Sequence, residues 1–246
     1  MFILPSREPM NFDILAPYYR GMERLLAGGK LHRCRIAFLD QIPPPQKILL
    51  LGEGHGRGLV EWSRQFPNAR ITCVDASAGM LAQARHELVR HDLSMVPVEF
   101  VHADILNWSP PSKTYDLVVT NFFLDCFRPE ELAHIIPKIA GSLTPDANWL
   151  LADFKVPPTG PRRVRARFIL WTMYAFFRSL TGLSAHQLTP PDLLLIRAGF
   201  TLHRRFESEW GLLHSDWWRQ KPSKTNILSQ LVSDLTSAIS GAPFQL

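Results

Sequence analysis

Residues 47–57 read KILLLGEGHGR, and this stretch decides the fold. The apolar run up to Leu51 is typical of a strand that is buried on both faces of a sheet. Glycines follow at positions 52, 54 and 56. Because glycine has no Cβ atom, the backbone can turn sharply there and a ligand can approach the main chain. A helical pattern begins directly afterwards, and the first N–H groups of a helix attract polar or anionic ligands. The stretch therefore predicts a strand, a ligand-binding turn and a helix.

Strand patterns and helical patterns alternate along the rest of the chain. Further strands are expected at 70–74, 98–102, 115–120 and 148–154, and helices after Ser77 and at 129–143 and 190–198. Strands that alternate with helices through short links form a parallel sheet covered by helices on both sides. One hairpin-like pair, 200–207 and 209–215, departs from this rhythm. The pattern predicts an α/β fold with a doubly wound, mostly parallel sheet.

Proline marks the boundaries of the expected parts of the chain. The sequence holds 20 prolines among 246 residues, and many stand between expected elements. Pro43–Pro45 separates an expected N-terminal helical cap, residues 1–42, from the α/β domain at 46–217. Residues 157–188 interrupt the alternation, and we expect a helical insertion there. Residues 222–246 carry apolar positions at helical spacing and predict a C-terminal helical tail.

Composition excludes several classes of protein. Three cysteines without a CxxC pair argue against a disulfide scaffold and against a cysteine-rich zinc site, and they suit a reducing compartment. The first ten residues lack the pattern of a signal peptide, so we expect a cytoplasmic protein. The apolar run 168–177 is too short to span a bilayer. Because arginines precede it and the net charge is +5, peripheral membrane contact stays open.

Polar side chains follow the expected strands at the points where these end. Asp75 ends the second strand, Asp104 follows the third, and Asn121 follows the fourth. A carboxylate at the second position can accept hydrogen bonds from a ribose diol, and ligands of open α/β sheets bind at this edge. Asp104 could accept a hydrogen bond from an adenine amine. These positions and the glycine turn together predict a nucleotide-like ligand, and no metal site.

This ordered set resembles the class I S-adenosylmethionine-dependent methyltransferases. The matching motifs are LLLGEGHGR (49–57), VDASAGMLAQAR (74–85), FVHADIL (100–106) and YDLVVTNFFLDCF (115–127). The resemblance implies a seven-stranded sheet in which the hairpin supplies an antiparallel last strand, and S-adenosyl-L-methionine as the cofactor. It further implies the cofactor-binding residues: the methionine part at Gly52, Gly54 and Gly56, the ribose at Asp75 with Ala76, the adenine at Asp104 with Ile105, and the methyl donor near Asn121.

The chain departs from the family's pattern at one position. The family commonly has an acidic residue two before the first glycine, and this chain has Leu50 there. We expect Glu53, inside the glycine turn, to supply the missing carboxylate towards the amino group of the cofactor.

The acceptor pocket is expected to form from three aromatic and aliphatic segments, 12–39, 122–127 and 157–188. The first contains FDILAPYYRGMERL, which looks similar to the entry segment of ubiquinone/menaquinone-biosynthesis type methyltransferases. Two candidate catalytic residues lie in these segments. Asp125 could orient or deprotonate an acceptor hydroxyl, or else cap a helix start. Tyr19 could close over the methionine end of the cofactor, or else pack against the sheet.

These observations favour a methyltransferase that acts on oxygen or carbon of a small, apolar or aromatic metabolite. The chain has no Asn-Pro-Pro-Tyr or Asp-Pro-Pro-Tyr at the fourth strand, which disfavours methylation of nucleic-acid bases. Two alternatives stay open: methylation of RNA or protein, suggested by the basic segment 162–167, and a protein that binds the cofactor without catalysis. The sequence leaves the oligomeric state open.

Overall fold

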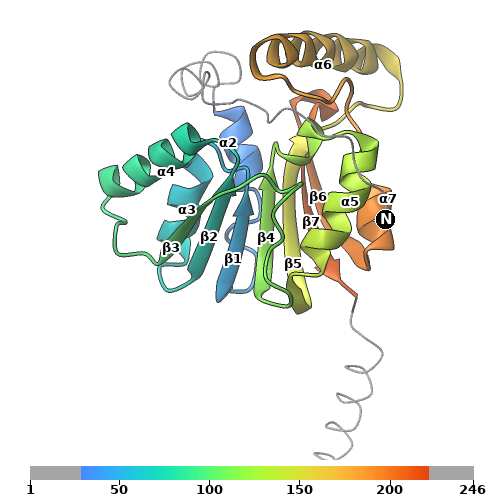
Figure 1. Cartoon of the computed structure of the whole chain (residues 1–246). Coiled ribbons are helices and arrows are strands. Elements are labelled where there is room, and N and C mark those ends of the chain that lie inside the picture. Colours follow the sequence, from blue (N-terminus) through green and yellow to red (C-terminus); the bar gives the residue numbers. More distant parts are fainter. Residues whose placement is uncertain (1–28, 222–246) are drawn as a thin grey trace, which may run out of the picture.

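The computed structural model describes residues 29–221, whose strands form one seven-stranded sheet (Figure 1). The strand order is β3-β2-β1-β4-β5-β7-β6, and β7 alone runs antiparallel to its neighbours β5 and β6. This confirms the predicted doubly wound sheet with a reversed last strand. The predicted helical segments within 1–28 and 222–246 lie outside the described residues. The strands are β1 Lys47–Leu51, β2 Arg70–Asp75, β3 Val98–His102, β4 Tyr115–Asn121, β5 Leu143–Phe154, β6 Phe200–Ser208 and β7 Leu213–Gln220.

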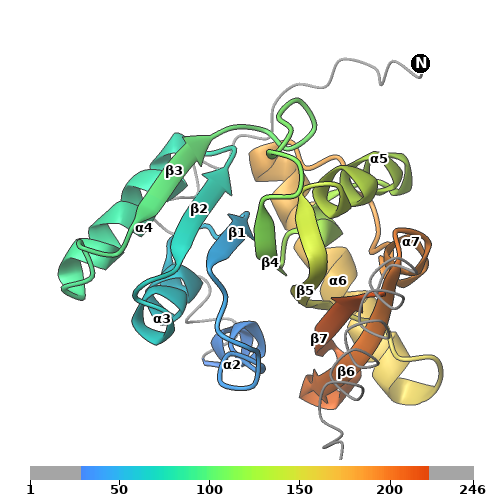
Figure 2. The same ribbon diagram turned by 90° about the horizontal axis from the view of Figure 1, so that it is seen from below.

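Helices cover both faces of the sheet, as Figure 2 shows from below. One face carries α2, α3 and α4, the other carries α5 and α7, and α6 lies across the edge where the parallel strands end (Figure 1). Two short 3-10 turns, η2 and η3, complete the list. The bounds are α2 Lys30–Arg35, α3 Arg57–Gln65, α4 Ala78–Arg90, η2 Leu124–Cys126, α5 Pro129–Ala140, α6 Gly160–Thr181, α7 Asp192–Arg197 and η3 Glu209–Gly211.

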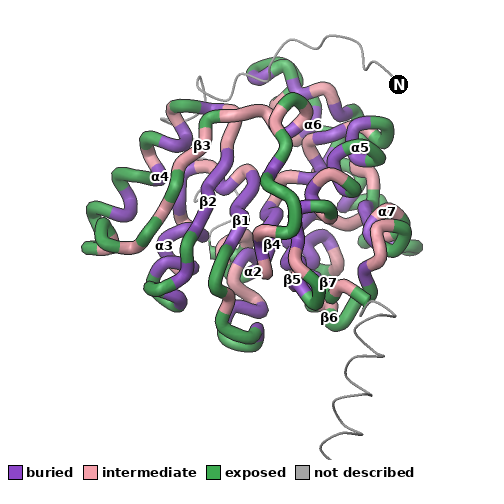
Figure 3. The backbone as a smooth tube through the Cα atoms, turned by 60° about the horizontal axis from the view of Figure 1, so that its bottom comes forward, coloured by how far each residue is buried: buried purple, intermediate pink, exposed green. Residues whose placement is uncertain are grey.

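The centre of the sheet is buried on both faces because its strands are apolar at every position. In β1, Ile48 and Leu50 point to the face covered by α3 and α4, whereas Leu49 and Leu51 point to the α5 face. All four side chains are almost fully buried (Figure 3). Leu50, the departure from the family pattern, is therefore a core residue. Burial of such a side chain contributes about 2 kcal/mol.

The parallel register brings the ends of the central strands to one edge. Leu51 of β1 is paired with Val74 of β2 on one side and with Thr120 of β4 on the other. Asn121, the next residue of β4, is paired with Ala152 of β5. The glycine turn and the polar residues that follow these strands consequently share that edge, as expected for ligand sites in open α/β sheets.

The second strand of the predicted hairpin is displaced along the chain. Residues 209–215 were expected to form it, but Glu209–Gly211 form η3, and β7 runs from Leu213 to Gln220. Glu209, Trp210 and Gly211 have φ values of 54°, 61° and 83°, which no strand accommodates. The strand continues further because Trp217 and Trp218 are buried, one on each face of the sheet.

Candidate active site

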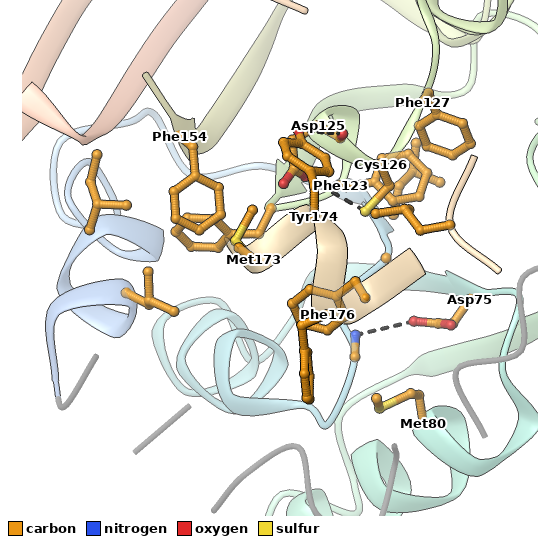
Figure 4. Close-up of a pocket in the computed structure, with 18 of the residues that line it drawn as sticks. Asp75, Met80, Phe123, Asp125, Cys126, Phe127, Phe154, Met173, Tyr174 and Phe176 are labelled. Atoms are coloured by element: carbon orange, nitrogen blue, oxygen red, sulfur yellow. Dashed lines mark hydrogen bonds between the residues drawn. The ribbon is translucent and has the colours of Figure 1, made fainter. Parts of the chain in front are cut away.

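A cavity of about 560 Å³ lies between the carboxyl-terminal edge of the sheet and α6 (Figure 4). One part is lined by residues that follow the strands, including Gly52, Gly54, Asp75 and Asp104. The other part is lined by aromatic and aliphatic side chains from η2, β5 and α6, labelled in Figure 4. A cavity of this size suits small ligands.

The three glycines of the turn serve different purposes. All have positive φ (65°, 66° and 85°), which L side chains adopt at a cost. A Cβ atom on Gly52 would lie 2.2 Å from the Phe123 ring, and one on Gly56 would lie 2.6 Å from the Cα atom of Ala84. A Cβ atom on Gly54 would have no neighbour nearer than 4.0 Å, so Gly54 leaves space open on the cavity side. Gly56 is not among the residues that line the cavity, and its contact with the methionine part of the cofactor stays a prediction.

Glu53 directs its carboxylate at the start of α3, and its predicted contact with the amino group of the cofactor stays a prediction. Its buried carboxylate accepts hydrogen bonds at Oε1 from the N–H groups of Gly58 (2.5 Å) and Leu59 (3.0 Å). These are unpaired donors in the first turn of α3, where a carboxylate is also favoured by the helix dipole. Glu53 is not part of the cavity lining. It therefore stabilises the turn and the helix start instead of reaching into the cavity.

Asp75 holds its carboxylate at the cavity through two backbone hydrogen bonds. Oδ2 accepts from the N–H of Gly54 at 3.2 Å (dashed in Figure 4), and Oδ1 accepts from the N–H of Ser77 at 2.9 Å. Ser77 in turn caps α4, accepting from the N–H of Met80. Asp75 and Ala76 both line the cavity, as predicted for residues that face a ribose. Each carboxylate oxygen retains acceptor capacity for a ligand hydroxyl.

Lys138 of α5 anchors the backbone of the segment that follows β3. Asp104 accepts a hydrogen bond from the N–H of Leu106 (2.9 Å), and Lys138 Nζ donates to the carbonyl groups of Ile105 and Leu106, both at 2.9 Å. Burial lowers the pKa of Lys138, and the charge of Asp104 counteracts part of that shift. Asp104 and Ile105 line the cavity. These hydrogen bonds from Lys138 thus fix the position of residues 104–106 at the wall of the cavity.

Asn121 lies near the cavity edge of the sheet without lining the cavity. Asn121 is buried at the end of β4 and is absent from the cavity lining. Its Nδ2 atom has no hydrogen-bond partner among residues 29–221. Tyr19 lies outside the described residues. The predicted place of Asn121 near the methyl donor and the predicted closure of Tyr19 over the methionine end remain predictions.

A sharp turn after β4 forms the aromatic wall of the cavity. Phe122 adopts a left-handed conformation (φ 52°), and its N–H donates to the carbonyl of Ala152 at 2.7 Å. Its ring lies 5.2 Å from that of Phe154, and the ring of Phe123 lies 5.0 Å from that of Phe127. Non-glycine residues in this conformation concentrate at functional sites. All residues of the segment 122–127 except Leu124 thus line the cavity together with α6.

Two buried carboxyl groups stand beside this wall. Asp125 lines the cavity, and Asp153, at the end of β5, is 1% exposed. Burial raises the pKa of both carboxyl groups, and the charge of Asp125 raises that of Asp153 further. No salt bridge joins either group to a cation within residues 29–221. The Tyr174 hydroxyl donates to the backbone carbonyl of Asp125 at 3.0 Å, which ties α6 to the turn.

Sequence reasoning missed Asp153 and Tyr174. The motif LLADF ends the fifth strand with a carboxylate, the same signal that identified Asp75, so Asp153 could have been found. Tyr174 lies within an apolar helix, and no local pattern marks its contact with residue 125.

Both cationic side chains of the cavity lining contact residues of η3. Lys30 and Glu209 form an ion pair at 2.5 Å, and Arg165 donates to the backbone carbonyl of Glu209 and lies 5.2 Å over the Trp210 ring. Within the described part of the chain, no cluster of three His, Cys, Asp or Glu side chains could hold a metal ion. The site is therefore largely apolar, with Asp75, Asp104 and Asp125 as its principal acidic groups.

A family model described as a methyltransferase domain matches residues 48–146. This stretch begins in β1 and contains the glycine turn, Asp75, Asp104 and Asp125. This matched segment, together with its curated methyltransferase relatives, identifies a class I S-adenosylmethionine-dependent methyltransferase domain. The family uses S-adenosylmethionine, and the acidic groups and the open turn at the cavity fit that cofactor.

Two curated relatives of this methyltransferase domain show how far the similarity extends. The trans-aconitate 2-methyltransferase of Rhodopseudomonas palustris (strain BisB18) is 37% identical over 109 residues, which cover 44% of this chain and 39% of the relative. The carboxy-S-adenosyl-L-methionine synthase of Aeromonas hydrophila is 28% identical over 161 residues, 63% of this chain and 61% of the relative. The chain spans less than two thirds of the length of either relative.

Solved structures show that the methyltransferase fold extends beyond the matched segment. An O-methyltransferase family protein from Burkholderia thailandensis superposes with a TM-score of 0.63 at 16% identity. The superposition covers 89% of this chain and 65% of that chain. At this identity the likeness establishes the fold alone.

Proposed function

We propose that the chain transfers the methyl group of S-adenosylmethionine to an oxygen or carbon atom of a small, apolar or aromatic acceptor. The observation that carries this proposal is one continuous cavity with two kinds of wall. Acidic and glycine residues at the strand ends form the cofactor part, and the rings of residues 122–127, Phe154 and α6 form the acceptor part. Methyl transfer is an in-line displacement, so a shared cavity that aligns both reactants supplies most of the catalysis.

The geometry of the glycine turn and of the strand ends supports an assignment of the cofactor-binding residues. We assign the ribose to Asp75 with Ala76, the adenine to Asp104 with Ile105, and the methionine part to Gly52 and Gly54. When bound, the cofactor supplies an electrophilic methyl group. Asn121, whose buried amide nitrogen has no partner among residues 29–221, would stand near that group from the end of β4.

Asp125 is the proposed base for an acceptor that carries a proton. Burial raises its pKa above the usual carboxyl range, and a higher pKa makes a carboxylate a stronger proton acceptor. The hydrogen bond from Tyr174 to the Asp125 carbonyl fixes the backbone that carries this group. An acceptor hydroxyl would give its proton to the Asp125 carboxylate while its oxygen attacks the methyl group. Tyr19 remains a second candidate, for closing the methionine end.

The cavity favours an acceptor with less charge than trans-aconitate, the substrate in the name of the R. palustris relative. Lys30 and Arg165 are the cationic side chains of its lining. Lys30 forms an ion pair with Glu209, and Arg165 donates to the Glu209 carbonyl and lies over the Trp210 ring. A tricarboxylate buried there would lack matched positive charge. The same apolar walls make RNA and protein acceptors less suitable. A chain that bound the cofactor without catalysis would show no turnover with any acceptor.

Calorimetric titration with S-adenosylhomocysteine tests the cofactor part. We expect Asp75→Ala to weaken binding by about 10- to 100-fold, because hydrogen bonds to a charged group contribute about 1.5–3 kcal/mol. Asp40→Ala, which removes an exposed carboxylate elsewhere, is the matched control. If the unsubstituted chain does not bind S-adenosylhomocysteine, the proposal fails. Methyl transfer to phenolic acceptors of increasing apolar area, compared with trans-aconitate, then tests the acceptor part.

A further inference from the structure

Helix α6 has an apolar outer face besides the face that closes the cavity. Val164, Phe168 and Trp171 follow one another at i, i+4 and i+7, and they are 70%, 65% and 68% exposed. The residues that pack on the protein, Ala166, Leu170, Tyr174 and Thr181, lie on another side of the helix. A helix in water normally presents polar residues outwards. The outer stripe of Val164, Phe168 and Trp171 is therefore unexplained by the fold.

The charge of α6 has a single sign. The helix contains five arginines and no acidic residue: Arg162, Arg163, Arg165, Arg167 and Arg178. Successive residues of an α-helix are 100° apart, so Arg165 flanks the outer stripe on one side, and Arg167 with Arg178 on the other. Trp210, 68% exposed, adds a further aromatic ring beneath Arg165. The outer stripe is thus apolar at its centre and cationic along both margins.

We propose that the outer stripe of α6, with Trp210, docks on the surface of a bilayer that contains anionic lipid. Within residues 29–221, no helix is long and apolar enough to cross a membrane, so α6 would lie in the headgroup region. Phe and Trp side chains at the centre would enter the acyl boundary, and the arginines would meet lipid phosphates. Nucleic acid would match the arginines but would leave the exposed Val164, Phe168 and Trp171 in water.

This placement would bring the cavity to the lipid surface. Ile169, Met173 and Phe177 of the same helix line the cavity, and so does Phe176, which is 42% exposed. Phe176 thus connects the lining of the cavity with the exposed surface of the helix that carries the outer stripe. If the proposed methyl transfer holds, on which this step rests, the acceptor is a lipid-soluble molecule that enters from the bilayer.

Cosedimentation of the full chain with vesicles tests the proposal without cofactor or acceptor. We expect binding to vesicles of equimolar phosphatidylserine and phosphatidylcholine, weaker binding to phosphatidylcholine alone, and a decline with added salt. Phe168→Ser/Trp171→Ser should lower the partition coefficient at least about tenfold. Arg167→Gln/Arg178→Gln should lower it by about 30-fold on the anionic vesicles.

Matched controls distinguish the outer stripe of α6 from exposed apolar side chains and positive charges elsewhere on the protein. Leu193→Ser/Ile196→Ser removes two exposed side chains of α7, and Arg70→Gln/Lys113→Gln removes two charges at the opposite edge of the sheet. Neither should change partitioning. None of these positions lines the cavity, so S-adenosylhomocysteine binding should stay unchanged in all four variants. A failure of that binding in the unsubstituted chain would therefore concern the proposed function and not the membrane surface.

Four results would overturn the proposal. The first is that the chain sediments with neither vesicle, and the second is that its sedimentation is insensitive to the α6 variants. Light scattering could instead reveal a dimer that Phe168→Ser/Trp171→Ser dissociates, without vesicle binding, in which case the outer stripe contacts a second copy of the chain. Equal loss in the control variants would likewise count against a surface formed by α6.

Discussion

Two groups of buried acidic side chains on the same part of the sheet differ in their partners. Asp216 in β7 is fully buried, and its carboxylate accepts two hydrogen bonds from Arg205, at 2.7 and 2.6 Å. His214 Nδ1 lies 3.0 Å from the same carboxylate. Asp125 and Asp153 are buried as deeply but have no cationic partner in the described chain. We call Asp216 the paired carboxylate, and Asp125 with Asp153 the cavity carboxylates.

The difference in partners separates a structural role from a chemical one. Burial alone would raise the pKa of Asp216, but the hydrogen bonds from Arg205 and His214 outweigh it and lower that pKa. Nothing comparable offsets burial at the cavity carboxylates, whose pKa values are raised. A carboxylate that is permanently ionised and paired stabilises β6 and β7. A carboxyl group with a raised pKa beside a cavity is a candidate for proton transfer.

The largest expected effect is the loss of catalysis in Asp125→Asn. A general base contributes about 10²- to 10⁴-fold in rate, so kcat should fall by about that factor while S-adenosylhomocysteine binding persists. The amide keeps the shape of the side chain, and stability should not decrease. Steady-state kinetics on an acceptor with a hydroxyl group would measure the loss.

The pH profile gives that prediction a second readout. In the unsubstituted chain, kcat should rise with pH as Asp125 loses its proton, at a pH above the usual carboxyl range because its pKa is raised. Asp125→Asn should abolish this rise. A variant with nearly full kcat and the same pH profile would assign the base elsewhere.

The paired carboxylate should respond through stability. Arg205→Met leaves Asp216 buried without its counter-charge, and breaking a buried ion pair by removing one partner costs about 3–5 kcal/mol. Urea unfolding should show that loss, and Arg204→Met, at an exposed neighbour on the same strand, should not. Asp216→Asn in the Arg205→Met background should restore much of it. If Arg205→Met unfolded at an unchanged urea midpoint, Asp216 would not depend on the pair.

The sequence predicted the positions of the cavity residues better than their roles. Strand ends such as Asp75 and Asp104 could be located because the register of a parallel sheet brings them to one edge. The direction in which the Glu53 side chain points could not be predicted, because its contacts with Gly58 and Leu59 depend on how the turn meets α3. The close approach of Gly56 to α4 could not be predicted for a similar reason. A Cβ atom there would collide with the backbone of Ala84, which is distant in the sequence.

The paired carboxylate shows a second limit of sequence reasoning. Its partner Arg205 lies 11 positions earlier on an antiparallel neighbour, where Arg205 and Asp216 occupy matching register positions. The predicted hairpin ended at residue 215, one residue before Asp216. The local pattern favoured a strand over 209–215. Positive φ at residues 209–211 was not predictable from it, because only one of these three residues is glycine.

Asp153→Asn should produce a smaller effect, of opposite sign to that of Arg205→Met. Because its native pKa is raised, the native state holds a proton that the unfolded chain has already released above about pH 4. Stability therefore falls as pH rises from there through the raised pKa. The amide removes that cost, so we expect a gain on the order of 1 kcal/mol at neutral pH, roughly 2–4 °C in Tm.

Thermal unfolding across pH distinguishes this effect from a simple packing change. The gain in Asp153→Asn should vanish towards pH 3, where both states are protonated. The contribution of the paired carboxylate has the opposite dependence: its native pKa is lowered, so it is present at neutral pH and is lost as pH falls through that pKa. A pH-independent change in Asp153→Asn would contradict the raised pKa.

The smallest effect is expected at Asp192, the outer partner of Arg205. Its Oδ1 accepts from Arg205 Nη2 at 2.7 Å, but its side chain is 32% exposed, whereas that of Asp216 is fully buried. Exposed ion pairs contribute about 0–1 kcal/mol and are screened by salt. Asp192→Asn should therefore shift the urea midpoint slightly at low salt and less at high salt. A loss as large as that of Arg205→Met would show that Arg205 stabilises the protein through α7 and not through the buried carboxylate.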